Sequence, residues 1–293
     1  MPQTINTNIV SLNAQRNLNA SQASLTTSMQ RLSSGLRVNS AKDDAAGLAI
    51  AERMNSQVRG MNVAVRNAND GISLAQTAEG ALAKVGDSLQ RMRELAVQAR
   101  NATNSSSDKD SLDKEYQELA AEITRVIGGT TFNGQQILAN VGTLTFQIGA
   151  NTTANDAIAI NTSNLNADTT VTAVTGAGIG ATVDVGTIRT NSAPAASDAT
   201  GIAKVIDDID SAINTVNDTR AAYGATQSRF DAVISNLQQA VENQAAARSR
   251  IMDADFATET ANMSRAQILQ QAGTAMVAQA NQLPQQVLQL LQR

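Results

Sequence analysis

The clearest pattern in the chain is a seven-residue repeat of apolar or small positions that predicts one long helix. The positions in this register are Gly47, Met54, Met61, Ala68, Ala75, Leu82, Leu89 and Ala96. A second register, four residues further on, weakens after Ile72. At 1.5 Å per residue such a helix is roughly 80 Å long, with an apolar face along it. Ser40, with Asp43 three residues later, predicts a capping box at the start of the helix.

Two further helices are predicted by similar spacings. Apolar residues between Leu112 and Val126 alternate steps of four and three, and the segment GGTTFNG ends this helix. Between Ile202 and Ile251 the seven-residue step returns and passes through Phe230. The two long apolar faces and the shorter one can bury one another as an elongated bundle.

Both ends of the chain also have amphipathic helical patterns. The apolar positions are Leu18, Leu25, Met29, Leu32 and Leu36 near the N-terminus, and Leu269, Met276, Leu283, Val287 and Leu290 near the C-terminus. Because helices flank a central region on both sides, we expect the two ends of the chain to lie side by side. The predicted fold is mainly α: an elongated antiparallel helical bundle or coiled coil, with the terminal helices paired as an inner domain.

The region from about 140 to 200 has a different character, because it is rich in Thr, Asn, Ala and Gly. Alternation in TLTFQIG, together with the segments AIAI and TVDVGTI, predicts a few short strands separated by turns. We expect these strands to form a small β-rich tip at the far end of the bundle. The segment GAGIGA matches a dinucleotide-binding glycine pattern, but no helix follows it, so we interpret it as part of the tip.

The composition restricts the chemistry that the chain can perform. Aromatic residues make up 2% of the chain, and His, Cys and Trp are absent. A thick core is therefore hard to build, and Ser-His-Asp, Cys-His and HExxH sites are impossible. The clustered aspartates lie at predicted helix starts or on helix faces, where capping and solvation explain them. We expect no enzymatic activity, no metal and no cofactor.

The charge pattern argues against nucleic acid and membrane as partners. The net charge is -4, no basic patch is visible, and two tyrosines offer little surface for base stacking. The N-terminal segment does not have the pattern of a secretory signal peptide, and no run of about 18 apolar residues predicts a membrane span. Taken alone, these features predict a soluble, cytoplasmic protein.

Four glycines lie inside the predicted long helix: Gly60, Gly71, Gly80 and Gly86. Each costs roughly 1 kcal/mol relative to alanine in a helix interior. They indicate either simple tolerance within a bundle, or a close approach of helices that permits small sliding between packed states.

The C-terminal helix is unusual because no charged residue lies between Arg265 and Arg293, and Pro284 lies in its most apolar part. A lone pair of terminal helices is thin and marginal in water, and it would leave apolar flanks exposed. Either the pair packs within one molecule, or copies of the protein bury these helices against one another. We favour the second, because an uncharged helix meets no electrostatic penalty among identical neighbours. We also predict that the helix continues past Pro284, although proline removes a backbone donor.

Several long motifs resemble those of the bacterial flagellins. They are INTNIVSLNAQRNL, RLSSGLRVNSAKDDAAGLAIAERM, LQRMRELAVQARNATNSSSD, TTFNGQQIL, FQIGAN, RIMDADFATETANMSRAQILQQAGTAMVAQAN and QVLQLL. They cover roughly residues 1–150 and 200–293 in the order of the family. The middle does not resemble the large outer domains that many flagellins carry. The chain therefore looks like a short flagellin with the two inner domains and a small β element.

The resemblance implies a subunit that self-assembles into the hollow helical filament of the bacterial flagellum, for motility. It implies that residues 1–39 and 255–293 form a terminal coiled-coil inner domain, the filament core. Residues 40–254 would form a rod domain with a variable tip at about 140–200. The resemblance also implies export through the flagellar type III apparatus without a signal peptide, and a location outside the cell. The implied partners are other copies of the chain, an export chaperone on the C-terminal segment, and the filament cap and hook-junction proteins.

The same resemblance implies recognition by a host Toll-like receptor of innate immunity, through a surface that corresponds to Arg91, Leu95 and Glu115. Two alternatives to a filament subunit stay open. One is a hook–filament junction protein, which shares the terminal motifs, and the other is a secreted adhesin that binds host surfaces through the 140–200 region. The central motifs RMRELAVQA and FNGQQIL favour the filament subunit.

Overall fold

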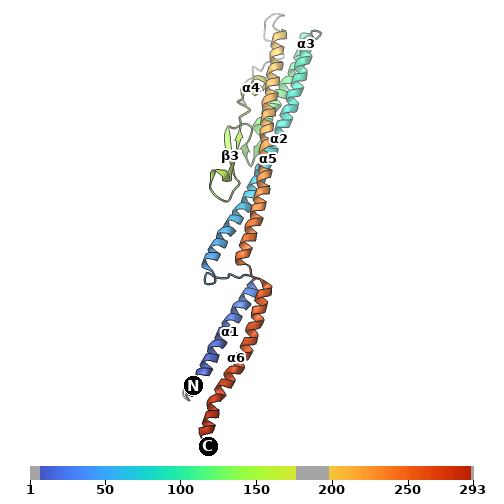
Figure 1. The fold of residues 1–293 in the computed structure, drawn as a ribbon. Helices are drawn as coiled ribbons and strands as arrows, with labels where there is room; N and C mark the ends of the chain where they lie inside the picture. Colours follow the sequence, from blue (N-terminus) through green and yellow to red (C-terminus); the bar gives the residue numbers. More distant parts are fainter. Residues whose placement is uncertain (1–6, 176–197, 292–293) are drawn as a thin grey trace. The chain divides into compact units, whose positions relative to one another are not determined.

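The structure is a computed structural model that describes the backbone of residues 7–175 and 198–291, and the side chains of residues 7–175 and 201–282. Its helices are α1 (Ile9–Ser34), α2 (Ala45–Ala99), α3 (Ser106–Gly129), α4 (Thr169–Thr175), α5 (Asp198–Met252) and α6 (Phe256–Leu291) (Figure 1). Its strands are β1 (Thr131–Phe132), β2 (Gln135–Gln136), β3 (Gly142–Gln147) and β4 (Ala157–Thr162), with a short 3-10 turn at Ala154–Asp156. The predicted mainly α fold with a small β element is confirmed.

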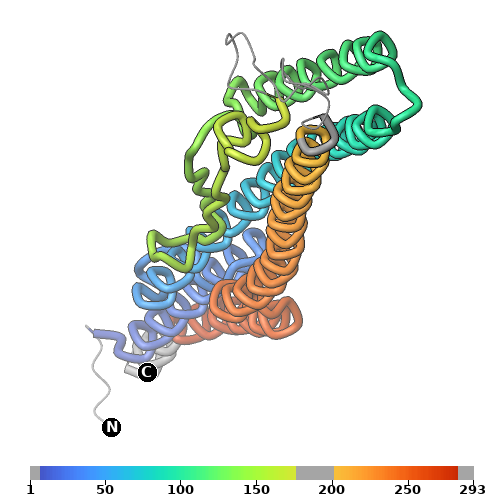
Figure 2. The backbone as a smooth tube through the Cα atoms, turned by 90° about the horizontal axis from the view of Figure 1, so that it is seen from above, coloured from blue at the N-terminus to red at the C-terminus, as the bar shows by residue number. Residues whose placement is uncertain are grey.

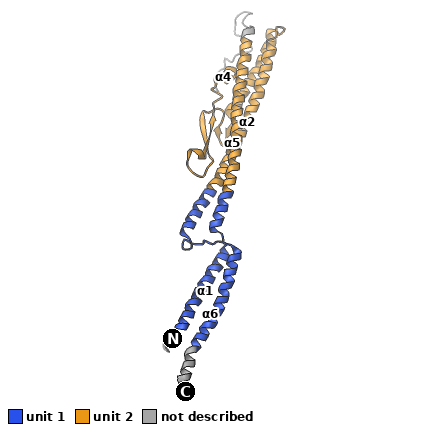
Figure 3. Ribbon diagram, in the orientation of Figure 1, with its two compact units in different colours: residues 1–58, 242–293 blue, residues 59–241 orange. Residues whose placement is uncertain are grey.

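The chain divides into two compact units, which Figure 3 colours separately. Residues 1–58 and 242–293 form the first, which we call the terminal unit, and residues 59–241 form the second, the central unit. Helices α1 and α6 belong to the terminal unit, and α3, α4 and the strands belong to the central unit. The expected boundaries at residues 39 and 255 concern the assembled filament and stay a prediction.

A large hydrophobic core runs through the central unit, and the predicted repeats line it. The repeat positions of α2 and α5 that are buried in it are Ala68, Ala75, Leu82, Leu89, Ala96, Ile202, Ile209, Val216, Tyr223 and Phe230. Helix α3 adds the buried side chains of Tyr116 and Ile123. It begins with a capping box, in which Ser105 and Asp108 exchange hydrogen bonds. The seven-residue spacing therefore identified both the helices and the faces that they bury.

The start of α2 differs from the prediction. Asp43 Oδ2 accepts hydrogen bonds from the amide and the hydroxyl of Ser40, at 2.9 and 3.1 Å, as in a capping box. These bonds close a turn, however, and the helix begins only at Ala45. Its cap is Asp44, whose Oδ1 accepts from the amide of Gly47 at 2.8 Å. Two adjacent aspartates offer two caps, and Asp44 is the one whose carboxylate reaches an amide of the helix, that of Gly47.

The strands form two small antiparallel sheets. β1 pairs with β2 across a turn at Asn133 and Gly134, whose φ angles of 49° and 78° are those that an Asn-Gly hairpin turn requires. β3 pairs with β4 in the register that places Gly142 opposite Thr162. The strands predicted from TLTFQIG and AIAI are thus confirmed. The segments GAGIGA and TVDVGTI lie outside the described residues.

Within the central unit, the β3–β4 hairpin packs alongside α2 (Figures 1 and 2). Asn67 Nδ2 donates to the carbonyl of Gln147 at 2.9 Å, and Phe146 packs edge-on against Phe230 with ring centroids 5.7 Å apart. The reason is that α3 returns along α2, so the chain leaves α3 already part-way down that helix. The 140–200 region also contains α4 and the start of α5, so it is not wholly β.

Candidate functional site

The two terminal helices, α1 and α6, pack side by side and antiparallel within the terminal unit. Asn8 near the start of α1 contacts Ala280 near the end of α6, while Arg31 at the other end of α1 faces Glu259. Between these contacts the backbones come close at Gly273, where a β-carbon would lie 3.2 Å from Leu18 Cδ1. We call these two helices the terminal pair.

The side chains buried between the two helices of the terminal pair are small or polar. The buried positions are Ser11, Ser28, Glu259, Ala266 and Ala280, each with an exposed fraction of 7% or less. On α6, Ala266 and Ala280 belong to one seven-residue register with Gly273 between them. Contacts of this kind bury little apolar area, so they contribute little hydrophobic stabilisation.

Large apolar side chains of the terminal pair face solvent instead. Those at least half exposed are Ile9, Val10, Leu12, Met29, Phe256, Ile268, Leu269 and Met276, with exposed fractions between 50% and 67%. Fully burying a Leu or Met side chain contributes about 1.5–3 kcal/mol, so covering the exposed half of each offers roughly 1 kcal/mol per residue to a partner. A surface of this kind marks an interaction site.

The residues that the sequence assigned to packing at the terminal helices divide into three groups. Leu18, Leu25, Leu32 and Leu36 are partly buried. Met29, Leu269 and Met276 are exposed. The side chains of Leu283, Val287 and Leu290 lie outside the described residues, although the backbone of α6 is helical to Leu291 and therefore past Pro284, as predicted.

A shallow groove of about 300 Å³ lies on the terminal pair, and both helices line it. Its apolar lining includes Val10, Ala14 and Leu18 from α1, and Leu269 and Met276 from α6. The groove therefore exists only while the two helices are paired, because neither helix forms it alone.

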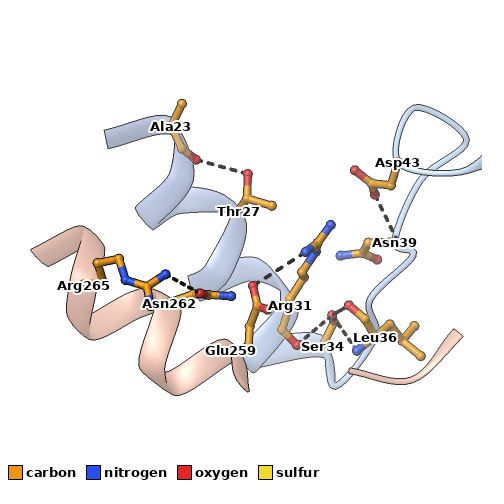
Figure 4. A network of polar contacts seen from close by, with 10 residues as sticks. All are labelled: Ala23, Thr27, Arg31, Ser34, Leu36, Asn39, Asp43, Glu259, Asn262 and Arg265. Atoms are coloured by element: carbon orange, nitrogen blue, oxygen red, sulfur yellow. Dashed lines mark hydrogen bonds and ion pairs between the residues drawn. The ribbon is translucent and has the colours of Figure 1, made fainter. Parts of the chain in front are cut away.

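Polar contacts hold the end of the terminal pair where α1 stops and α6 starts (Figure 4). Arg31 points from α1 to the buried carboxylate of Glu259, with 3.8 Å between Nη1 and Oε1 (Figure 4). The carbonyl of Gly35, which has a left-handed φ of 71°, accepts from the amide of Ala254 at 2.9 Å. Asp255 caps α6. Its carboxylate accepts hydrogen bonds from the Thr258 hydroxyl and from the amides of Thr258 and Ala257, and these bonds hold the pKa of Asp255 below its ordinary value of 3.8.

Sequence analysis missed the polar members of this pair, namely Asn8, Ser11 and Glu259. Ser11 lies seven residues before Leu18 and thus on the predicted face of α1, but a search for apolar positions does not select a serine. Asn8 is the N-cap of α1, with its side chain accepting from the amide of Ser11 at 3.0 Å. An Asn three residues before a Ser is too common a pattern to single out without the structure.

The surface expected to meet an innate receptor lies on α2 and α3 of the central unit. Arg91 Nε donates to Glu115 Oε1 at 2.9 Å, and Arg91 Nη1 donates to Glu94 Oε2 at 3.0 Å. The hydrogen bond to Glu115, and to a smaller extent the one to Glu94, raises the pKa of Arg91 above its ordinary value. The Arg91 and Glu115 side chains are about half exposed, whereas Leu95 is 1% exposed and packs in the core beneath them.

Other kinds of site find no support in the parts of the chain that the structure describes. No helix there is long and apolar enough to span a membrane. No group of three or more Asp and Glu side chains in the same residues is placed to hold a metal ion. The exposed apolar face of the terminal pair is the candidate site, because several large apolar side chains gather on it.

Comparison with known proteins shows the family of the chain. Residues 5–143 match the family model of the bacterial flagellin N-terminal helical region, and residues 206–291 match that of the bacterial flagellin C-terminal helical region. The chain belongs to the bacterial flagellin family. It is 44% identical to a flagellin of Serratia marcescens over 350 aligned residues, covering 99% of this chain and all of that protein. It is also 44% identical to a flagellin of Halalkalibacterium halodurans, with 98% of this chain and 99% of that protein covered.

Among solved structures, the chain is similar to a putative flagellar hook-associated protein of Vibrio parahaemolyticus. The TM-score is 0.56, with 72% of this chain and all of that chain covered, but the identity is 11%, so this similarity shows the fold alone. Membership of the flagellin family makes the chain a structural subunit of the extracellular flagellar filament and not an enzyme.

Proposed function

We propose that the terminal pair is the segment through which this flagellin joins the filament, by burying its exposed apolar face against the same helices of other copies. The observation that carries the proposal is the reversed distribution of side chains, with small and polar groups between the helices and Leu269 and Met276 outside. A helix pair that exposes its larger apolar groups gains more from identical neighbours than from its own interior. Residues 1–39 and 255–293 then form the filament core.

The mechanism is folding coupled to association. Isolated helices are marginal in water, and the small contacts between α1 and α6 add little to their stability. The ordering of the ends is therefore favoured once neighbouring copies cover them. The small side chains at the interface leave the pair weak in the monomer, which keeps the monomer from presenting a rigid assembly surface.

Export and delivery follow from the same chemistry. We propose that the subunit leaves the cell through the flagellar type III apparatus as an unfolded chain and is added under a filament cap, beyond the hook-junction proteins. An export chaperone that holds the C-terminal segment would cover exposed residues such as Ile268, Leu269 and Met276. The weak terminal pair supports this proposal, because a segment that is marginally stable alone is easily kept unfolded.

The direct test is a pair of substitutions on α6, Leu269→Gln with Met276→Gln, in the full chain. Both side chains are at least half exposed, so we expect the monomer to keep its helix content and its melting temperature. Salt-induced assembly, followed by light scattering and electron microscopy, should fail or require at least about ten-fold more protein, because each lost contact is worth roughly 1 kcal/mol and recurs at every neighbour.

A matched control places the same change in the central unit. Val141→Gln alters an apolar side chain that is 76% exposed but lies before β3, outside the terminal pair. We expect filaments of this variant at the ordinary protein concentration. Normal assembly of the α6 double variant, or equal loss of assembly in both proteins, would show that the terminal pair does not carry the association.

We also propose that a host Toll-like receptor recognises the monomer through Arg91 and Glu115. These two groups form an exposed ion pair between α2 and α3, and the buried Leu95 supports α2 beneath them. Arg91→Ala and Glu115→Ala should each weaken receptor activation by soluble monomer at least about ten-fold, as truncation of a charged interface group does. Arg125→Ala, which removes an exposed arginine paired with Glu122 on α3, is the control and should leave activation unchanged.

A further inference from the structure

The N-cap residue of α1 makes a second hydrogen bond that joins it to α6. Asn8 accepts from the amide of Ser11 with its side-chain oxygen, at 3.0 Å, and its Nδ2 donates to the carbonyl of Ala280 at 2.7 Å. These two bonds fix the orientation of the amide, because the cap needs an acceptor and the carbonyl needs a donor. Beside them, Ser11 Oγ donates to Asn281 Oδ1 at 2.8 Å.

The acceptor of this bond lies inside a helix, where carbonyl groups normally have a partner already. In an α-helix the carbonyl of residue 280 receives the amide hydrogen of residue 284. In this chain residue 284 is proline, which has no amide hydrogen. The proline therefore leaves the carbonyl of Ala280 without its usual helical donor, and the carbonyl belongs to a residue that is 3% exposed.

We propose that Pro284 acts as a docking device: it frees the Ala280 carbonyl, and that carbonyl receives Asn8 and so positions the start of α1 on α6. A buried carbonyl without a donor is costly, so the Asn8 side chain satisfies a real deficit rather than adding a spare contact. The N-cap of α1 and the proline of α6 are thereby joined across the chain.

The consequence is that the start of α1 becomes ordered only when α6 lies beside it. A cap stabilises the first turn of a helix, and here the same side chain must also reach the neighbouring helix. The position of the start of α1 along α6 also decides which residues face each other in the groove of the terminal pair. Val10 and Leu18 of α1 line this groove together with Leu269 and Met276 of α6. The role of Asn8 and Pro284 in assembly, as positioning residues, rests on the proposed function.

The test uses full-length monomer in which the terminal pair is held together without a filament. The chain has no cysteine, so Leu18→Cys with Gly273→Cys gives a single defined disulfide. A β-carbon at residue 273 lies 3.6 Å from the Cβ of Leu18, within the range that disulfides require. Hydrogen exchange of the first turn of α1 and of the last turns of α6 is then measured in this stapled monomer, with the reduced protein alongside.

Two variants separate docking from ordinary helix preferences. Asn8→Asp keeps an oxygen for the cap but has no donor for Ala280, and Pro284→Ala returns an amide hydrogen to position 284. Local rules predict that each change stabilises its own helix, through the helix dipole and through helix propensity respectively. If Asn8 docks on the Ala280 carbonyl, each substitution should instead speed exchange in the first turn of α1 about five-fold, which is the factor for one hydrogen bond. Pro284→Ala should at the same time slow exchange in α6.

The double variant and a control complete the design. Because Asn8→Asp removes the donor of this contact and Pro284→Ala adds a competing donor to its acceptor, adding Asn8→Asp to Pro284→Ala should speed α1 exchange by less than about two-fold more. Asn19→Asp, an identical change at an exposed position of α1, should leave exchange unchanged.

Unchanged or slower exchange in the first turn of α1, in either single variant, would overturn the proposal. So would equal effects of Asn8→Asp and Asn19→Asp, because the added charge alone would then explain them. The staple lies within one chain, so these outcomes do not depend on whether the Leu269 and Met276 variants form filaments. Failure here is therefore distinct from failure of the proposed assembly surface.

Discussion

The central unit and the terminal pair are both built from amphipathic helices, but they bury different kinds of side chain. The central unit buries its largest side chains, among them Tyr116, Phe230, Leu82 and Leu89, at 0% exposure. The terminal pair buries Ser11, Ser28 and Ala280, and it exposes Leu269 and Met276. The first arrangement buries large apolar side chains within the molecule, whereas the second leaves large apolar side chains at the surface, where under the proposed function other copies cover them.

The difference shows that amphipathic periodicity alone does not say which partner a helix face will meet. Both regions have seven-residue apolar repeats, and in the central unit the repeat faces the core of the same molecule. In the terminal pair the register of small residues, Ala266, Gly273 and Ala280, faces the partner helix. Leu269 and Met276 of α6 lie outside this register and are at least half exposed, whereas Leu18 of α1 faces Gly273.

The largest expected difference between the two regions concerns truncation of a leucine. Leu82→Ala removes a fully buried side chain from the central core, so the free energy of unfolding of the monomer should fall by about 2–5 kcal/mol. Leu269→Ala, at a half-exposed position of α6, should change it by less than about 0.5 kcal/mol. Denaturant unfolding of both monomers measures this, and equal losses would remove the distinction between the two regions.

A smaller effect is expected from alanine at two glycines of α2. A β-carbon at Gly71 would lie 2.7 Å from the buried ring of Phe230, so Gly71→Ala should destabilise the central unit by about 1–3 kcal/mol. At Gly80 nothing lies within 4 Å, so Gly80→Ala should stabilise the helix by up to about 1 kcal/mol. Thermal unfolding should show opposite shifts, and shifts of the same sign would mean that Gly71 is not a close-packing position.

The ion pair between α2 and α5 should contribute still less. Arg93 Nε donates to Asp210 Oδ1 at 2.6 Å, but both side chains are almost half exposed. Exposed pairs contribute about 0–1 kcal/mol and weaken with salt, so Asp210→Asn should lower stability by at most about 1 kcal/mol. Unfolding at low and high ionic strength should show the loss only at low salt; an equal loss at both would indicate a desolvated pair.

The smallest effect is local to the start of α6. Because its pKa is lowered in the folded state, Asp255 contributes stability above its ordinary pKa of 3.8 that is lost as pH falls through the folded value. The protection of amides in the first turn of α6, taken relative to their intrinsic exchange rates at each pH, should therefore fall below about pH 4. Asp255→Asn keeps a capping oxygen without titrating, so it should abolish this acid response. An unchanged response in that variant would assign the effect to another group.

Much of the fold could be predicted because apolar spacing is a strong local signal. Leu82, Leu89, Tyr223 and Phe230 occupy the faces that the repeat indicated. Contacts between distant segments were not predictable in the same way. The place of the β3–β4 hairpin depends on where α3 ends along α2, and the choice of Asp44 over Asp43 depends on which carboxylate reaches the helix amides.

The candidate site was predicted only in outline. The amphipathic ends indicated which helices form it, but they did not say that on α6 the small residues face α1 while Leu269 and Met276 face outward. The hydrogen bond from Asn8 to Ala280 joins residues 272 positions apart, and only the structure brings them together. Pro284, which the sequence left partly unexplained, takes on a role once that contact is known.

The central claim, that other copies cover the exposed face of the terminal pair, can be measured directly through its methionines. Met29 and Met276 are 54% and 59% exposed, whereas Met92 in the central core is 0% exposed and is an internal reference. Peroxide oxidation, followed by peptide mass analysis of monomer and filament, compares their accessibility. The account predicts that Met29 and Met276 oxidise readily in the monomer and at least about ten-fold more slowly in the filament, with Met92 slow in both. Equal oxidation of Met29 and Met276 in monomer and filament would contradict it.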